Sequence, residues 1–320
     1  MKTPEVSIVI AAYNCGNFIT ETISSVINQT FQNWELIIVD DCSSDNTPKK
    51  IAAFNDNRIS IIRLDKNSGQ PATPRNIGIR AAKGKFIAFL DHDDIWTPEK
   101  LKIQVDFLRE NPETALICCP LKIISPCKKY NNAKTTPKKK FQTGYMYDKL
   151  LKYNFIACSS VVIKVSVLDE VGFFDEDPNV SAAEDWDLWL RIARQHKITF
   201  IPQALGHYRM HGMGLSTETK QIKRILYVIE KHVKNGWVTT VLANKAKANF
   251  YFVEGWFIID GNVKAAKEMF LNALKLNKAN LKILFGSLFG LSLSFFPKLC
   301  KYIKNNYLDR KIKHLFNLEN

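Results

Sequence analysis

Short apolar runs alternate with helix-like segments over the first hundred residues, and this alternation limits the fold more than any other feature. The apolar runs are 6–11, 35–39, 59–64 and 86–90, and bulky apolar runs of this length are typical of strands buried between helices. Helical spacing is present in 20–29 and in 74–83, and Gly84 supplies a helix stop. Alternating strands and helices require crossover connections. The sequence therefore predicts an α/β fold with a mainly parallel sheet flanked by helices.

Polar residues follow three of these predicted strands directly. They are Ala12-Tyr13-Asn14, Asp40-Asp41 and Asp91-His92-Asp93-Asp94. Ligands of open parallel sheets bind at the carboxyl ends of the strands, so we expect the three groups to meet at one rim. Clustered carboxylates repel one another and lose hydration there, and a divalent cation with a substrate phosphate would compensate them. A solvated acidic turn is the alternative for the last group taken alone.

The middle of the chain adds further elements of the same kind. Residues 159–163 and 198–201 are predicted strands. Ser181-Ala182-Ala183-Glu184 fits a capping box, which places Ser181 at the N-cap and Glu184 at the third position of a helix that runs to about 195. We expect one domain from residue 1 to about 215, because strand patterns end there.

Residues 216–320 have an entirely helical pattern and form the second expected domain. Segments 246–259 and 261–274 resemble the two helices of one tetratricopeptide unit. The fifteen residues 283–297 carry no charge, which is too short for a membrane-spanning helix. Six basic residues follow between Lys298 and Lys313. An apolar stretch before a basic one predicts an anchor on an anionic membrane surface, and a buried helix with a solvated end is the alternative.

Charge is divided unevenly along the 320 residues. Residues 1–210 hold 27 basic and 24 acidic side chains, whereas residues 211–320 hold 18 and 7. The basic region predicts an anionic partner. Nucleic acid is not expected, because only Tyr130 interrupts the lysine-rich loop 128–140 and no stacking platform is present.

Seven cysteines at irregular spacing, without a CxxC pair, argue against a disulfide framework and a zinc site. The apolar run at 6–12 is too short for a signal peptide and continues as a strand. We therefore expect a cytoplasmic protein, placed peripherally at the inner face of the cytoplasmic membrane by its basic tail.

An ordered set of motifs closely resembles glycosyltransferase family 2 on a GT-A fold, over about residues 4–215. The set is Ala12-Tyr13-Asn14, Asp40-Asp41, Arg75-Asn76-x-Gly78, Asp91-x-Asp93-Asp94, Glu184-Asp185 and Tyr208-Arg209-x-His211. The resemblance implies an inverting transferase that uses a nucleotide diphosphate sugar. Thr73-Pro74 replaces the small residues that usually precede the arginine of this family, so the local backbone there is an open point.

The resemblance also implies roles for individual residues on the donor side. Asp41 corresponds to the aspartate that binds the nucleobase, with uracil as the expected base. Ala11, Ala12 and Tyr13 would line the base and ribose pocket, and Arg75 would face the nucleotide. Asp91 and Asp93 would bind Mn²⁺ or Mg²⁺, with Asp91 also near the ribose. His211 is a further metal ligand in several relatives, and a surface histidine is its alternative.

The remaining roles concern the acceptor. Asp185 corresponds to the catalytic base, and its place at a helix N-terminus predicts that ionisation is favoured. Glu184 would border the acceptor. Trp186 is a candidate to stack on the acceptor sugar, and Trp189 is expected in the core. His92 and Asp94 have no expected contact with the metal.

These expectations combine into a metal-dependent inverting glycosyltransferase. Its donor would be a UDP-sugar, and its acceptor a hydroxyl of a free or lipid-linked saccharide, in the synthesis of bacterial surface polysaccharide, lipopolysaccharide or teichoic acid. A dinucleotide-binding dehydrogenase is excluded because GxGxxG is missing after the first strand, where only Gly16 occurs. The alternative that stays open is an inactive sugar-nucleotide-binding scaffold of a membrane-bound assembly complex.

Overall fold

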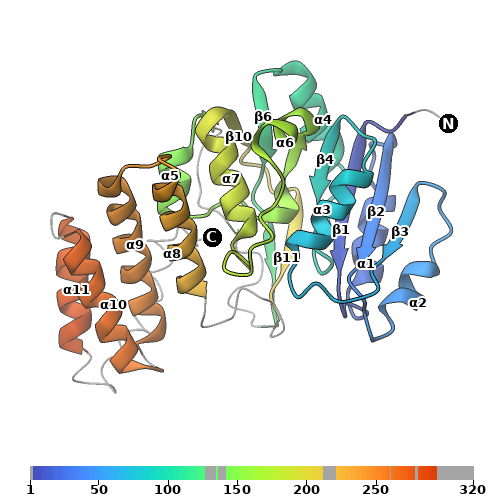
Figure 1. Cartoon of the computed structure of the whole chain (residues 1–320). Helices are drawn as coiled ribbons and strands as arrows, with labels where there is room; N and C mark the ends of the chain where they lie inside the picture. The colour runs from blue at the N-terminus through green and yellow to red at the C-terminus, as the bar shows by residue number, and fades with distance from the viewer. Residues whose placement is uncertain are drawn as a thin grey trace. The chain divides into compact units, whose positions relative to one another are not determined.

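The structure is a computed structural model that describes residues 3–126, 135, 142–211, 221–259, 261–277 and 280–293 (Figure 1). These residues form two compact units. One contains the described parts of 1–146 and 155–217, and the other the described parts of 147–154 and 218–319. In this division residues 147–154 belong to the helical unit although they precede the predicted boundary at 215. Most of the lysine-rich loop 128–140 and all of the basic tail lie outside the described residues.

A mixed sheet forms the centre of the first unit, with strand order β3-β2-β1-β4-β9-β6-β10-β8. Its strands are β1 (Val6–Ala12), β2 (Trp34–Asp40), β3 (Ile59–Arg63), β4 (Phe86–Phe89), β6 (Thr114–Cys118), β8 (Gln142–Gly144), β9 (Val162–Lys164) and β10 (Lys197–Phe200). Strands β1 to β4 pair in parallel, as the alternation predicts. Strand β9 runs antiparallel to β4 and β6. A small second sheet has the order β5-β11-β7, with β5 (Ile95–Trp96), β7 (Lys122–Ile124) and β11 (Gly206–Arg209).

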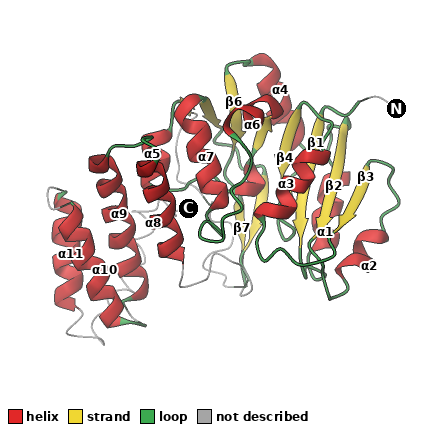
Figure 2. Ribbon diagram, in the orientation of Figure 1, coloured by secondary structure: helices red, strands yellow, loops and turns green. Residues whose placement is uncertain are grey.

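Helices cover both faces of the main sheet (Figure 2). They are α1 (Ile19–Ile27), α2 (Thr47–Ala52), α3 (Ala72–Ala81), α4 (Lys100–Glu110), α6 (Val165–Val171) and α7 (Glu184–Gln195). Because side chains alternate along a strand, Ile8 and Ile10 pack in one core with residues of α1 and α4. The neighbouring Val9 lies against Gly78 of α3, and Phe89 of β4 contacts Trp189 of α7 with ring centroids 6.1 Å apart. Helices therefore exclude water from both faces of the main sheet, which explains the uninterrupted apolar runs of its strands.

Two local predictions are wrong, and side-chain chemistry explains the first. Residues 158–160 form a 3₁₀ turn rather than the start of a strand, because both the backbone N–H and the hydroxyl of Ser160 donate to the Ala157 carbonyl. The second is the capping box. Helix α7 begins at Glu184 with Ala183 as its N-cap. Ala182 takes the left-handed conformation with φ of 62°, so the chain turns between Ser181 and the helix and the serine does not cap it.

The second unit is helical in all its described residues. It contains α5 (Tyr147–Lys152), α8 (Gln221–Lys234), α9 (Thr240–Ile258), α10 (Val263–Leu276) and α11 (Leu281–Leu293). Helix α5 belongs here because Tyr147 Oη lies 2.9 Å from His232 Nδ1, and Asn249 Nδ2 donates to the Lys152 carbonyl at 2.9 Å. The predicted helical pair at 246–259 and 261–274 is present as α9 and α10. No helix among the described residues is long and apolar enough to cross a membrane.

Candidate active site

The acidic segment after β4 is fastened to β1 and α1 through His92. The His92 ring lies with Nδ1 3.0 Å from the Ala11 carbonyl oxygen, and Thr22 Oγ1 donates to the His92 carbonyl at 2.9 Å. The backbone N–H of Asp91 donates to Ser159 Oγ at 3.0 Å. His92 therefore positions the segment through these two contacts. Ser159 is a supporting residue that sequence reasoning missed, because the residues that contact it are distant in the chain.

Asp94 is buried and joins this segment to β11. Its Oδ1 accepts the backbone N–H of Arg209 at 2.9 Å. Burial, together with the charges of Asp93 and Asp91, raises the pKa of Asp94 well above the ordinary carboxyl value. A buried carboxyl group that joins two segments in this way has a structural role.

Asp93 and His211 lie together at the surface of the site. Asp93 Oδ2 is 2.7 Å from His211 Nε2, and the His211 ring stacks on Phe18 with centroids 4.7 Å apart. Arg209 Nε donates to the Asp93 carbonyl at 2.9 Å, which holds the two segments together. A carboxylate oxygen and an imidazole nitrogen side by side are suitable donors for Mn²⁺. Asp91 is not gathered with them, and the described residues contain no cluster of three or more potential metal-binding side chains.

Arg75 links Asp91 to the start of α7. Its Nη1 donates to Glu184 Oε1 at 2.6 Å, and its Nη2 donates to Asp91 Oδ1 at 2.7 Å. Arg75 and Glu184 are both buried, and the guanidinium carbon lies 5.3 Å from the centre of the Phe174 ring. The sequence assigned Arg75 to the nucleotide and Glu184 to the acceptor. In this structure the two side chains bind each other, 109 positions apart in the chain, and the two assigned roles stay predictions.

Asp185 follows Glu184 in the first turn of α7, and its Oδ1 accepts the backbone N–H of Trp186 at 2.6 Å. Burial and the neighbouring Glu184 charge raise the pKa of Asp185 to about 7, although Arg75 acts in the opposite direction. Desolvation thus opposes the ionisation that a helix N-terminus favours. The indole of Trp186 is buried as well, so its ring is covered where the sequence expected an acceptor-facing surface.

Asp41, at the end of β2, is buried and holds the loop before α3. Its Oδ1 accepts the backbone N–H of Ser68 at 2.8 Å, and its Oδ2 accepts the Ser68 hydroxyl at 2.7 Å. Asn67 Nδ2 donates to Asp41 Oδ2 at 3.1 Å. Both residues were missed by sequence reasoning. The signal that marks them is the turn sequence Asn67-Ser68-Gly69, in which Gly69 has φ of 77°.

The segment after β1 combines an exposed ring with a strained turn. Ala12 is buried, Ala11 is half-buried, and Tyr13 is 45% exposed. Asn14 has φ of 44°, and its Oδ1 accepts the backbone N–H of Ser44 at 2.9 Å. This bond ties the segment after β1 to the one after β2, so two of the three predicted polar groups are joined at the rim. The Tyr13 ring itself stays exposed beside this bond.

The Arg75-Asn76-x-Gly78 motif fixes α3 against the sheet. Asn76 Nδ2 donates to the Phe174 carbonyl at 2.9 Å and to Glu176 Oε1 at 2.7 Å. A Cβ on Gly78 would lie 2.4 Å from Val9 Cγ1, so only glycine lets α3 approach β1 this closely. Thr73 donates to Glu176 Oε2 at 2.8 Å, and the helix already begins at Ala72. The unusual Thr73-Pro74 pair is thus part of a regular first turn.

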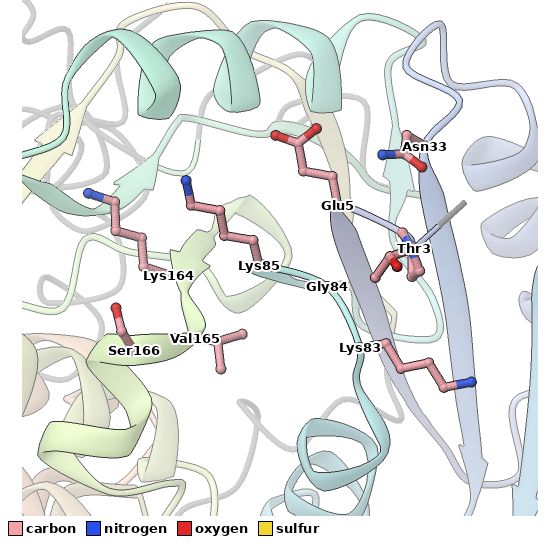
Figure 3. A pocket seen from close by; sticks show the side chains of 10 residues that line it. Thr3, Glu5, Asn33, Lys83, Gly84, Lys85, Lys164, Val165 and Ser166 are labelled. Carbon is pink, nitrogen blue, oxygen red and sulfur yellow. The ribbon is translucent and has the colours of Figure 1, made fainter. Parts of the chain in front are cut away.

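A separate pocket of about 620 Å³ lies at the amino end of β1, beside Glu5 (Figure 3). Strand β1 is seven residues long, which places this pocket about 20 Å from the rim described above. Lys83, Lys85 and Lys164 line it, and burial together with the adjacent Lys85 lowers the pKa of Lys164. The pocket is at the opposite end of the strands from the carboxylates and is distinct from the candidate site.

Solved structures identify the fold. The structure of S. aureus TarS 1–349 in complex with UDP-GlcNAc matches with a TM-score of 0.67 and 17% identity, covering 95% of this chain and 93% of that one. The mannosyltransferase PcManGT from Pyrobaculum calidifontis, in complex with GDP-Man and Mn²⁺, matches with a TM-score of 0.60 and 17% identity, over 96% and 88% of the two chains. The fold is that of the GT-A glycosyltransferases.

Sequence relatives then give the family. The E. coli protein "UDP-Glc:alpha-D-GlcNAc-diphosphoundecaprenol beta-1,3-glucosyltransferase WfgD" is 36% identical over 72% of this chain and 87% of its own length. "Putative teichuronic acid biosynthesis glycosyltransferase TuaG" of Bacillus subtilis is 30% identical over 70% and 87%. The model of glycosyl transferase family 2 matches residues 7–172. This chain belongs to glycosyltransferase family 2 and is a glycosyltransferase.

Proposed function

We propose that the protein transfers one sugar, with inversion at the anomeric carbon, from a nucleotide diphosphate donor to a hydroxyl of a saccharide acceptor. The observation that carries this proposal is the raised pKa of the Asp185 carboxyl group. A carboxyl group with a pKa of about 7 is suited to accept a proton near neutral pH. Arg75 pairs with both Glu184 and Asp91 on the donor side, so the residue before the proposed base is tied to the donor carboxylate.

In the proposed reaction Asp185 takes the proton of the acceptor hydroxyl. The hydroxyl oxygen attacks the anomeric carbon from the face opposite the diphosphate, and the carbon–oxygen bond to the diphosphate breaks. The bonding electrons leave with the nucleotide diphosphate. One displacement inverts the anomeric centre and needs no covalent sugar intermediate on the enzyme. The raised pKa makes Asp185 a stronger base than an ordinary aspartate once it is ionised.

We propose UDP-sugars as the donors. Tyr13 is the exposed aromatic side chain at the rim, next to Ala12, and Asp41 anchors the adjoining loop through Ser68. Asp41 Oδ1 accepts one of these hydrogen bonds and has a second lone pair, so it could also accept a pyrimidine N–H. The names of two relatives support the donor class, because the TarS structure contains UDP-GlcNAc and the name of WfgD specifies UDP-Glc.

Asp93 and His211 are the residues that would hold a Mn²⁺ or Mg²⁺ ion. Asp91, two positions before Asp93, is the further candidate ligand. When bound, such an ion neutralises charge on the diphosphate as it leaves. Asp91 is held by Arg75 in this structure, so its share in metal binding requires that bond to open. The PcManGT structure, which contains Mn²⁺, supports metal dependence.

We further propose a lipid-linked acceptor in bacterial surface polysaccharide synthesis, at the inner face of the cytoplasmic membrane. Two relatives support this acceptor class by their names, which specify a diphosphoundecaprenol acceptor and teichuronic acid biosynthesis. The excess of 18 basic over 7 acidic residues in 211–320 would favour contact with anionic lipid.

The test measures release of nucleotide diphosphate and formation of product. The chain is incubated with UDP-Glc, UDP-GlcNAc and GDP-Man, with Mn²⁺ or with EDTA, and with a short-chain polyprenyl-diphosphate GlcNAc acceptor. We expect metal-dependent transfer from a UDP-sugar, with the anomeric configuration of the product inverted when it is measured by NMR. Asp185→Asn should lower the rate by at least about a hundredfold and keep UDP binding, whereas the exposed Asp169→Asn should match the wild type.

Two results would oppose the proposal. Loss of UDP binding in Asp185→Asn would show that Asp185 supports the donor site rather than the proton transfer. Tight binding of UDP-sugars without turnover for any donor, with or without metal, would favour the inactive scaffold.

A further inference from the structure

Helix α11 packs on the helical unit through its glycines. A Cβ on Gly286 would lie 2.6 Å from the Phe252 ring, and a Cβ on Gly290 would lie 2.5 Å from the Phe270 ring. Ile283 on the same side is buried in the aromatic cluster formed with Trp256. The small residues of α11 therefore face inward, where they let the helix approach α9 and α10 closely.

Three large apolar residues of α11 face outward instead. Phe285 is 65% exposed, Leu288 46% and Phe289 49%. Their spacing of three and four positions places them on one side of a helix. We name these three residues the α11 outer face. A water-facing helix normally shows the reverse arrangement, with bulky apolar side chains inward and polar ones outward, so this face has the composition of an interaction surface.

The charges around α11 indicate what covers the outer face. From Met269 to Leu308 the chain contains six lysines and no acidic residue, and from Ile283 to Pro297 it contains no charge. An uncharged aromatic face between lysine-bearing flanks is complementary to an anionic lipid surface, where aromatic rings enter the interface and lysines meet the headgroups. A protein partner of acidic character would satisfy the lysines but not the three apolar side chains.

We propose that the α11 outer face inserts into the interface of an anionic phospholipid bilayer, with α11 lying along the membrane surface. Its 13 residues span about 20 Å, less than the thickness of the hydrocarbon core, so α11 lies in the surface rather than crossing it. This inference rests on the proposed membrane location and adds the residues that make the contact. The glycine packing holds the face in place before lipid is met, because α11 is already fixed to Phe252 and Phe270.

Vesicle flotation with the full chain tests the inference. Vesicles of phosphatidylglycerol with phosphatidylethanolamine are compared with vesicles of phosphatidylcholine alone. The test variant is Phe285→Ser/Leu288→Ser/Phe289→Ser. The matched control is Ile61→Ser/Tyr145→Ser, which removes two exposed apolar side chains from the other unit.

We expect the wild type and the control to float with anionic vesicles only, and the triple variant to bind at least about tenfold more weakly. Hydrolysis of the sugar nucleotide should be unchanged in the triple variant, because none of the three side chains belongs to the catalytic unit. The unfolding midpoint should fall only slightly, since the three side chains are exposed and Phe289 also meets the Trp256 ring, with centroids 6.1 Å apart. Circular dichroism should show the same total helix content in the wild type and the triple variant.

Three outcomes would overturn the inference. If the wild type does not bind anionic vesicles, the membrane location itself fails. If the triple variant binds as well as the wild type, the basic segments suffice and the α11 outer face is not used. If the wild type is a dimer without lipid and the triple variant a monomer that still floats, a second copy of the chain covers this face.

Discussion

Replacing Asp185 with asparagine should stabilise the protein, and the gain should depend on pH in a defined way. The pKa of Asp185 is raised from 3.8 to about 7. Below pH 4 the carboxyl group is protonated in both the folded and the unfolded chain, so it carries no penalty. As the pH rises from about 4 to about 7 the unfolded chain ionises first, and the folded chain loses stability relative to it. Above pH 7 the full penalty is present.

The size of this penalty follows from the difference between the two pKa values. A pKa raised from 3.8 to about 7 corresponds to about 4 kcal/mol. Relaxation and water entry reduce this, so we expect Asp185→Asn to raise the free energy of unfolding by about 2–4 kcal/mol at pH 8 and by nearly zero at pH 4. Asparagine still accepts the Trp186 N–H, which keeps the first turn of α7 intact.

Urea unfolding in EDTA-containing buffer at pH 4, 6 and 8, followed by intrinsic tryptophan fluorescence, measures this difference. Asp187→Asn is the matched control in the same helix. Asp187 is buried and accepts Arg191 Nε at 2.8 Å, so its removal leaves a buried guanidinium without its carboxylate and should destabilise by about 3–5 kcal/mol. A gain for Asp185→Asn that is the same at every pH, or a loss at pH 8, would refute the reasoning that burial suppresses ionisation of Asp185.

Three further predictions concern the donor side and α3. Gly78→Ala should destabilise by about 1–3 kcal/mol in urea unfolding, because its Cβ would meet Val9 Cγ1 at 2.4 Å; an unchanged midpoint would show that α3 shifts freely. Arg75→Met should cost about 3–5 kcal/mol above pH 5 by leaving the buried Glu184 unpaired, and adding Glu184→Gln should recover part of this in a double-mutant cycle. Asp93→Asn should weaken Mn²⁺-dependent UDP binding, measured by calorimetry, on the order of tenfold or more while leaving the unfolding midpoint in place; equal binding would remove Asp93 from the metal site.

The order of strands and helices could be predicted from sequence because it depends on local periodicity. The apolar runs before Ala12, Asp40 and Asp91 are strands β1, β2 and β4, and these pair in parallel. Two local predictions failed, one because of a side-chain hydrogen bond and one because of an unusual backbone conformation. At Ser160 a hydroxyl bond to Ala157 replaces the start of a strand, and at Ala182 a left-handed residue separates the serine from the helix it was expected to cap.

The candidate site likewise has features that the sequence determined and features that only the tertiary structure decided. The sequence by itself determined which polar residues follow buried strands, and therefore which side chains reach the rim where the sugar nucleotide would bind. Only the tertiary structure decided that Arg75 binds Glu184, that Trp186 is covered, and that the pKa of Asp185 is about 7. The physical reason is that ion pairing and desolvation depend on neighbours in space. Those neighbours come from segments as much as 109 positions apart, which no local pattern encodes.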